Sequence, residues 1–326
     1  MMPPSESTQP PIDILATVLD GEKYLGEFLD SILRQTYENW RLLIRDDGSS
    51  DRSAAIISSY EVRDPRIRMI GADGPKRLGA AQGFAWLLER SESPYSFFAD
   101  QDDVWLPEKI GKTMDAMLAA ESRRPRTPIL VHTDLRVVDA RLATIADSFW
   151  RYQGLDPVSG SSFERLLIDN SMTGCTVAVN RLLREAARPI PPEAVMHDWW
   201  LALAASAFGH IARVDEATIL YRQHGANDSG AHRYGAVPVL KHLAQRTASL
   251  LSGHGFGGDI HFEKAVRQAR AFAERFAPDL DPHRAGVLAA YASIDRLGFW
   301  RRRLFLIQNG ILKARLLMNI GLMFKV

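Results

Sequence analysis

The stretch "SFFADQDDVWLPEKI", from Ser96 to Ile110, contains three aspartates within four residues, directly after an apolar run. Carboxylates this close repel each other, so the pattern favours a positive partner. Asp100 and Asp102, two positions apart, can face one hard cation such as Mg²⁺ or Mn²⁺ that keeps coordination positions for phosphate oxygens. The alternative is that Asp103 and Glu108 only flank the start of the next helix. That alternative explains one or two of these acids, so we favour a site for a metal and a diphosphate.

Two other acidic segments carry candidate chemistry. In "RDDGSSD", Asp46 and Asp47 precede a glycine turn, where a carboxylate can bind a base or a ribose. An ordinary capping turn with Ser50 or Asp51 as the cap is the alternative. In "MHDWWLALAASAFG", Asp198 begins an apolar helix beside two tryptophans. Partial desolvation there would raise its pKa and suit a general base, whereas an N-cap role is the alternative.

Two further segments hold smaller candidates. "YRQHGAN" presents His224 after a strand, and a lone histidine is more often structural than a metal ligand. In "NSMTGCT", Gly174 permits close backbone approach. Cys175 has no charged neighbour in the sequence to activate it, so we do not interpret it as a nucleophile.

The elements that must position these residues alternate between strands and helices. Strands are predicted at 12–18, 40–45, 66–71 and 95–99, and helices at 23–35, 54–60, 79–91 and from Pro107, the last burying Ile110, Met114, Met117 and Leu118. Such alternation indicates a parallel sheet with crossover helices, whose carboxyl strand ends share one rim. Further strands are predicted at 128–138, 175–180 and 216–223, followed by helices from about residue 235.

Composition and charge narrow the class of protein. The chain has 326 residues, a formal net charge of +1 and one cysteine, which gives no global signal for nucleic acid and fits a reducing cytosol. Residues 1–10 are expected to be a disordered tail without signal-peptide character. The longest apolar run, near Asp198, is too short to span a bilayer.

The C-terminal segment has an unusual composition. From Arg296 to Val326 it contains seven Lys and Arg residues, no acid, and interleaved large apolar residues. This is typical of an interfacial helix attracted to anionic lipid. A helix packed on the rest of the protein with a solvated basic face is the alternative.

In order along residues 11–230, these segments resemble the family 2 glycosyltransferases. The resemblance comprises "ATVLDGEKYLGEFLDSILRQTYENW", "IRDDGSSD", "RLGAAQGFAWLL", "FFADQDDVWLPEKI", "TGCT", "HDWWLALAASAFG" and "YRQHGAN". The wording of the last motifs is most similar to a bacterial rhamnosyltransferase-like branch. The resemblance implies an α/β GT-A fold: a Rossmann-like, mixed, mainly parallel sheet flanked by helices, with a catalytic domain at 11–235 and a helical C-terminal region at 236–326.

The resemblance also implies roles for residues. Thr17, Asp47, Arg77 and Asp100 match nucleotide-binding positions, and Asp102, with Asp100 and His224, matches the site of a divalent cation, Mg²⁺ or Mn²⁺. Asp198 matches the general base, and Gly174, Cys175 and Trp199 lie where an acceptor pocket forms. The chain departs from the family where "PTYN" becomes "ATVLDG" and where the helix after strand three begins "RLGAAQG".

The function implied by the resemblance is inverting, metal-dependent transfer of a sugar. The favoured donor is dTDP-L-rhamnose, and the acceptor is a saccharide or lipid-linked glycan of cell-surface polysaccharide synthesis. The enzyme is expected in the cytoplasm, at the inner face of the membrane if its basic helix binds anionic lipid. The alternatives are a UDP- or GDP-sugar donor, or an inactive nucleotide-sugar-binding scaffold.

Overall fold

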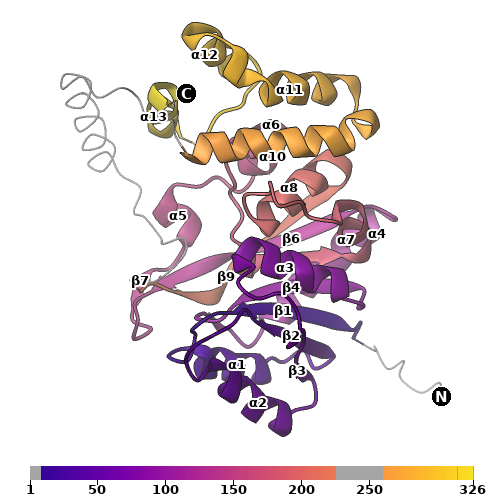
Figure 1. Cartoon of the computed structure of the whole chain (residues 1–326), viewed down its shortest axis with the longest axis vertical. Helices are drawn as coiled ribbons and strands as arrows, with labels where there is room; N and C mark the ends of the chain where they lie inside the picture. The colour runs from indigo at the N-terminus through magenta and orange to yellow at the C-terminus, as the bar shows by residue number, and fades with distance from the viewer. Residues whose placement is uncertain (1–8, 225–259, 314, 326) are drawn as a thin grey trace.

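The described strands form a single β-sheet. The computed structural model describes residues 9–224, 260–313 and 315–325. In the described residues the strand order is β3-β2-β1-β4-β8-β6-β9-β5, with β7 paired to β6 (Figure 1). The first four strands are parallel: β1 (Ile12–Val18), β2 (Trp40–Asp46), β3 (Ile67–Met69) and β4 (Tyr95–Asp100). They occupy the stretches predicted from the sequence.

The second half of the sheet mixes directions. β8 (Ala178–Asn180) runs antiparallel to β4 and to β6 (Ile129–Val138), whereas β9 (His210–Arg222) runs parallel to β6. The short β5 (Val104–Trp105) and β7 (Thr144–Ala146) pair antiparallel with β9 and β6. The sheet is therefore mixed and mainly parallel, as expected.

Helices cover both faces of the sheet. The helices up to α8 are α1 (Leu25–Leu33), α2 (Ser53–Arg63), α3 (Gly79–Arg90), α4 (Lys109–Arg123), α5 (Phe149–Gln153), α6 (Phe163–Leu166), α7 (Arg181–Ala187) and α8 (His197–Phe208). Alternate residues of β1 enter different clusters: Leu15 packs with α3 and α8, whereas Ile14 and Ala16 pack with α1 and α4. Burial on both faces explains why these strands are continuous apolar runs.

Two details of α4 differ from the sequence prediction. The helix begins at Lys109 with Glu108 as its N-cap, so Pro107 precedes it instead of starting it. Ile110, Met114 and Met117 are buried as predicted, but Leu118 is 40% exposed. Residue 118 follows Met117 by only one position, which rotates its side chain by 100° toward solvent.

The C-terminal helices share the core of the sheet domain. α10 (Ile260–Phe276), α11 (Pro282–Ala292), α12 (Phe299–Gln308) and α13 (Leu316–Lys325) form one end of the molecule (Figure 1). Phe272 and Phe276 of α10 lie 5.2 and 6.0 Å, between ring centroids, from Trp200 of α8. The predicted boundary near residue 235 falls outside the described residues. Within the described ranges, no helix is both long enough and apolar enough to cross a membrane.

A close backbone approach at Gly209 connects two elements of the predicted site. Gly209 joins α8, which carries Asp198, to β9, which leads to His224. A Cβ at this position would lie 1.9 Å from the carbonyl oxygen of Pro128, which accepts the His210 N–H at 2.9 Å. Only glycine fits here without moving the start of β6.

Gly209→Ala should therefore destabilise the fold, by about 1–3 kcal/mol of unfolding free energy, as overpacking does. The control is Gly286→Ala in α11, where an added Cβ meets no heavy atom within 4 Å. It should be stabilising by up to about 1 kcal/mol, because alanine favours helix. Urea denaturation measures both, and equal effects of the two substitutions would contradict the packing argument.

Candidate functional site

The strand ends converge on one rim as the topology predicts. Thr17 of β1 is in register with Arg45 of β2 on one side and with Asp100 of β4 on the other. Asp46 is the last residue of β2 and is in register with Val18, and Asp47 follows it. The segments that follow β1, β2 and β4 are thus neighbours at one edge of the sheet.

The acidic turn after β4 divides its carboxylates between surface and interior. The Asp102 carboxylate lies 2.7 Å from Nε2 of His224, and both side chains are partly buried. Asp103 is fully buried and accepts the backbone N–H of Arg222 at 3.1 Å. The alternative interpretation, in which Asp103 only flanks the start of the following helix, is therefore wrong for this residue. Carboxylate oxygens are the ligands that Mg²⁺ and Mn²⁺ prefer, so Asp100 and Asp102 could hold such an ion with His224 beside Asp102, and this ligand set stays a prediction.

Arg222 is a positioning residue that the sequence analysis missed. Its guanidinium, 1% exposed, donates to the carbonyl oxygens of Asp102 and Ala140 at 2.8 and 2.9 Å and to the Glu27 carboxylate at 2.7 Å. It also lies 4.4 Å from the ring centroid of Tyr24, which in turn is 4.9 Å from the His224 ring. Its place two residues before His224, directly after Ile219, Leu220 and Tyr221, was the available signal.

A second buried cluster lies behind the turn. The acidic oxygens of Asp100 and Asp103 and Sγ of Cys175 are within 4.8 Å of one another. Burial, with the nearby charges of Asp102 and Asp100, raises the pKa of Asp103 well above its ordinary value. Burial also lowers the pKa of Lys109 to about 7, with its ammonium 4.4 Å from the Trp105 ring centroid.

Cys175 belongs to this cluster, which corrects our view of its surroundings. Its neighbours do include charged groups, namely Asp103 and Lys109. Burial, and then the carboxylates of Asp103 and Asp100, raise the pKa of the Cys175 thiol well above its usual value. The thiol therefore stays protonated, which supports the expectation that Cys175 is not a nucleophile.

Two of the predicted nucleotide residues, Asp47 and Arg77, lie between β2 and α3. Asp47 is 2% exposed and accepts hydrogen bonds from Arg45 and from the N–H groups of Leu78 and Gly79 at 2.8–2.9 Å. Burial opposes ionisation of Asp47, but these donors outweigh it and lower its pKa. Arg77 is exposed, with a left-handed φ of 61°, and its N–H donates to the Asp47 carbonyl at 3.0 Å. Asp47 thus shapes the loop that presents Arg77.

Asp198 lies in the first turn of α8 and is not its N-cap, which is Met196. Burial raises the pKa of Asp198 to about 7, although N–H groups of Trp199 and Gly174 and the side chain of Asn170 partly oppose the shift. His197 packs between Phe84 and Phe98, at ring-centroid distances of 4.2 and 4.7 Å. Burial lowers its pKa to about 3, so it stays neutral and adds no positive charge beside Asp198.

Gly174 links Asp198 to the acidic turn. A Cβ on Gly174 would lie 3.1 Å from the His197 ring and 3.4 Å from Oδ2 of Asp198. The next residue, Cys175, approaches Asp100 and Asp103. The short segment Gly174–Thr176 therefore separates the buried carboxylate of Asp198 from the acidic turn.

Two predicted acceptor residues are buried. Cys175 is fully buried, and Trp199 is 2% exposed with its indole N–H donating to the Leu166 carbonyl at 2.6 Å. The Trp199 ring also stacks on His261 at 5.3 Å. In this conformation neither side chain presents a surface to an acceptor, so the acceptor prediction rests on Gly174.

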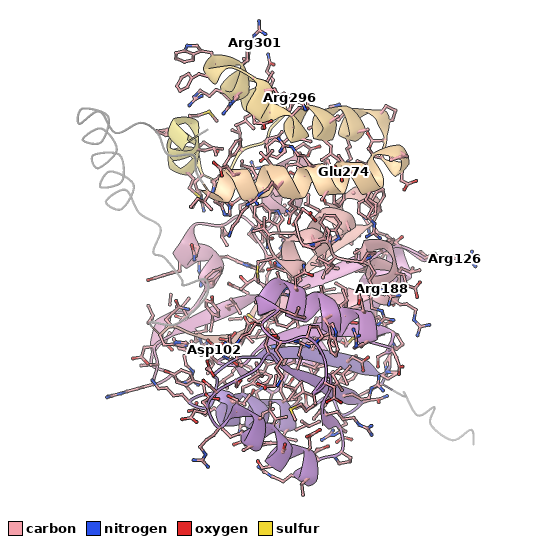
Figure 2. The ribbon with its side chains drawn as sticks, in the orientation of Figure 1. Asp102, Arg126, Arg188, Glu274, Arg296 and Arg301 are labelled. Atoms are coloured by element: carbon pink, nitrogen blue, oxygen red, sulfur yellow. The ribbon has the colours of Figure 1, made fainter. Side chains whose placement is uncertain are left out.

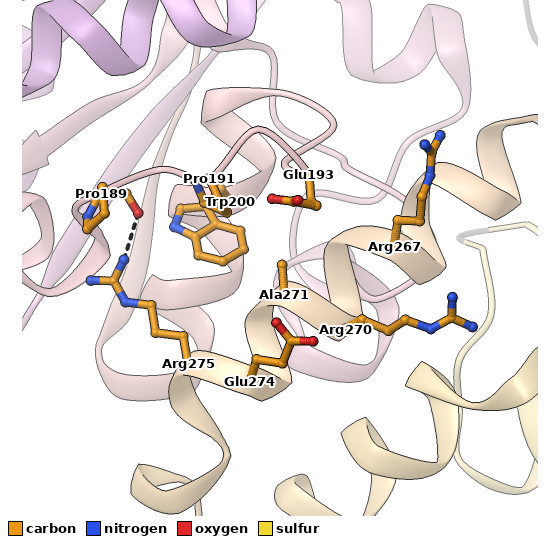
Figure 3. A pocket seen from close by; sticks show the side chains of 9 residues that line it. All are labelled: Pro189, Pro191, Glu193, Trp200, Arg267, Arg270, Ala271, Glu274 and Arg275. Carbon is orange, nitrogen blue, oxygen red and sulfur yellow. Dashed lines mark hydrogen bonds between the residues drawn. The ribbon is translucent and has the colours of Figure 1, made fainter.

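An open groove of about 510 Å³ lies elsewhere, between α10 and the loop before α8 (Figure 3). It is lined by Pro189, Pro191, Glu193, Trp200, Arg267, Arg270, Ala271, Glu274 and Arg275, and none of the predicted site residues is among them. Arg275 reaches across it to the Pro189 carbonyl at 2.6 Å. The groove therefore marks the contact between α10 and the loop before α8, which Arg275 stabilises.

Comparison with known proteins shows which fold the chain has and which family part of it resembles. The fold is that of the GT-A glycosyltransferases: a mannosyltransferase from Pyrobaculum calidifontis, solved with GDP-Man and Mn²⁺, superposes with a TM-score of 0.51 over 94% of this chain and 87% of that one, at 15% identity. The profile of "Glycosyl transferase family 2" matches residues 13–122. This stretch, about a third of the chain, is therefore similar to the family 2 glycosyltransferases.

Two curated relatives show the range of the similarity. The putative teichuronic acid biosynthesis glycosyltransferase TuaG of Bacillus subtilis is 29% identical over 34% of this chain and 43% of its own length. The dTDP-rhamnosyl transferase RfbG of Shigella flexneri is 26% identical over 65% of this chain and 73% of its own. The chain thus spans less than half of TuaG and about three quarters of RfbG.

Because the pKa of Asp198 is raised in the folded state, we expect the free energy of unfolding to depend on pH. From about pH 4 to pH 7 the folded state keeps a proton that the unfolded state releases, so ionisable Asp198 makes folding less favourable as pH rises through this range. Asp198→Asn should gain unfolding free energy relative to the parent as pH rises, on the order of 2–4 kcal/mol by pH 8. Urea titrations between pH 4 and 8 measure this difference, and a difference that stays constant with pH would contradict the buried ionisation.

Proposed function

We propose that the protein is an inverting, metal-dependent glycosyltransferase that moves L-rhamnose from dTDP-L-rhamnose onto a hydroxyl of a glycan. The observation that carries the proposal is the pairing of Asp102 with His224 at the strand rim, with the desolvated Asp198 carboxylate beyond Gly174. The match of residues 13–122 to family 2 supports the reaction class. The choice of sugar follows RfbG, whose name specifies a dTDP-rhamnosyl transferase.

Donor binding is assigned to residues of the rim. Thr17, Asp47, Arg77 and Asp100 would hold the nucleotide, with the exposed Arg77 available to a phosphate. Asp102, Asp100 and His224 would hold Mg²⁺ or Mn²⁺. A bound divalent cation neutralises charge that develops on a leaving diphosphate.

The reaction itself is a direct displacement. The acceptor oxygen forms a bond to the anomeric carbon while the bond from that carbon to the diphosphate oxygen breaks, and the diphosphate leaves with the electron pair. Asp198 takes the proton of the acceptor hydroxyl, for which a pKa of about 7 is well matched to neutral pH. Attack from the opposite side inverts the configuration, so a β-linked donor gives an α-rhamnoside.

The acceptor is proposed to be a saccharide carried by a membrane lipid, with Gly174 forming part of its pocket. A backbone position without a side chain lets a sugar hydroxyl approach the Asp198 carboxylate closely, since any Cβ would occupy that space. The enzyme would then work at the cytoplasmic, anionic surface of a membrane.

Donor choice can be tested by thermal shift with dTDP, UDP and GDP and their sugars, each with Mn²⁺, Mg²⁺ or chelator. A ligand that binds the native state raises the midpoint by mass action. We expect a metal-dependent rise with dTDP or dTDP-rhamnose that Asp102→Ala abolishes. A rise only with UDP or GDP would keep the reaction class and overturn the rhamnose assignment. No rise in folded protein would favour a scaffold or another ligand.

Loss of the proposed base should separate chemistry from binding. Asp198→Asn should lower kcat by about 10²–10⁴-fold, as loss of general-base catalysis does, while the nucleotide-induced thermal shift stays. The parent rate should rise with pH to a plateau above pH 7, because the ionised carboxylate accepts the proton. A measurable parent rate no higher than that of Asp198→Asn would overturn the assignment of Asp198 as the base, and no transfer by the parent would overturn the enzyme assignment.

A further inference from the structure

Helix α12 is built with its apolar side outward. Trp300, Leu304 and Ile307 recur at spacings of four and three residues and so form one stripe, and they are 78%, 54% and 56% exposed. Phe299, beside Trp300 at a ring-centroid distance of 5.0 Å, is 52% exposed. A helix that only packed on the protein would turn these residues inward.

The inner side of α12 is anchored by an arginine. Arg303 is 8% exposed and donates to the carbonyl oxygens of Met323 and Phe299 at 2.7 and 2.6 Å. Its guanidinium lies 3.3 Å from the ring centroid of Phe299. Together with the fully buried Leu306, this fixes the rotation of the helix, so the outward stripe is part of the fold.

Basic side chains surround the stripe. Arg296 and Arg301 are exposed, and Figure 2 shows both at the end of the molecule that α12 forms, with Asp102 far from this end. From Arg296 to Val326 the chain has seven Lys and Arg residues and no acid. The surface formed by Phe299, Trp300, Leu304, Ile307, Arg296 and Arg301 is called the α12 surface below.

We propose that the α12 surface docks on an anionic lipid bilayer, with the apolar stripe at the boundary between headgroups and acyl chains and the arginines on lipid phosphates. Tryptophan and arginine favour this interface, and anionic lipid complements the charge. A second copy of the chain fits less well, because a two-fold contact would bring basic residues against basic residues. The inference deepens the membrane setting of the proposed function, yet it does not depend on the identity of the donor.

The test is flotation of the full-length protein with vesicles, without nucleotide or acceptor. We expect binding to vesicles of phosphatidylcholine with phosphatidylglycerol, and at least tenfold weaker binding to phosphatidylcholine alone. Trp300→Ser with Leu304→Ser and Ile307→Ser should reduce binding at least tenfold, and Arg301→Glu should weaken mainly the anionic component. Val62→Ser is the matched control, since Val62 is 89% exposed on α2, outside the α12 surface.

Two further measurements keep the outcome clear. The triple variant should retain the thermal midpoint and the rate of transfer to a soluble acceptor, so a failure of the proposed reaction would leave the vesicle result interpretable. Equal binding of parent and triple variant, or no binding of the parent, would overturn the proposal. A dimeric parent that ignores vesicles and becomes monomeric in the triple variant would assign the α12 surface to a second copy instead.

Discussion

The buried Arg222 connects the acidic turn after β4 to the end of β9. Its guanidinium donates to the Asp102 carbonyl oxygen and pairs with the Glu27 carboxylate, while its backbone N–H donates to the Asp103 carboxylate. Burial and the nearby charges of Asp102 and Asp100 raise the pKa of Asp103, which lessens the repulsion among the three carboxylates. Asp100 and Asp102 are thereby left at the rim, and His224, two residues after Arg222, is brought to Asp102. The geometry of the proposed cation site follows from one buried arginine.

Asp198, the proposed base, is positioned by the C-terminal helices through their contacts with α8 and the loop before it. Arg275 of α10 donates to the carbonyl oxygens of Pro189 and Ala186 at 2.6 and 3.1 Å, and Gln268 accepts the Val195 N–H at 2.8 Å. These bonds fix the loop that leads into α8, and the aromatic contacts of Phe272 and Phe276 with Trp200 fix the helix itself. Asp198 is desolvated because α8 is packed between the sheet and α10, which is why the helical C-terminal region matters for the chemistry.

The parts of the fold that local pattern determines were predictable. The strand "IDILATV" and the helix "GAAQGFAWLLER" lie where the apolar pattern predicts them, because each buries its own apolar residues. Strand direction after β4 was not, since alternation along the chain says nothing about which edge a later strand joins. The same limit explains the missed role of Arg222 and the charged neighbours of Cys175, because contacts between residues 103, 109, 175 and 222 arise only from tertiary packing. The strand-end aspartates were identifiable because topology alone brings them together.

The division of the chain near α4 has an evolutionary consequence. The family profile ends at residue 122, inside α4, and contains Thr17, Asp47, Asp100 and Asp102 but neither Asp198 nor His224. The proposed nucleotide-binding residues thus lie in one contiguous stretch, which meets the later part of the chain where β4 pairs with β8 and at the 3-10 helix Gly174–Thr176. If these residues bind the donor as proposed, related proteins can keep the donor-binding stretch while the rest of the chain diverges. Substitutions among relatives are then expected to concentrate beyond α4, where a different acceptor can be accommodated without changing the proposed donor-binding residues.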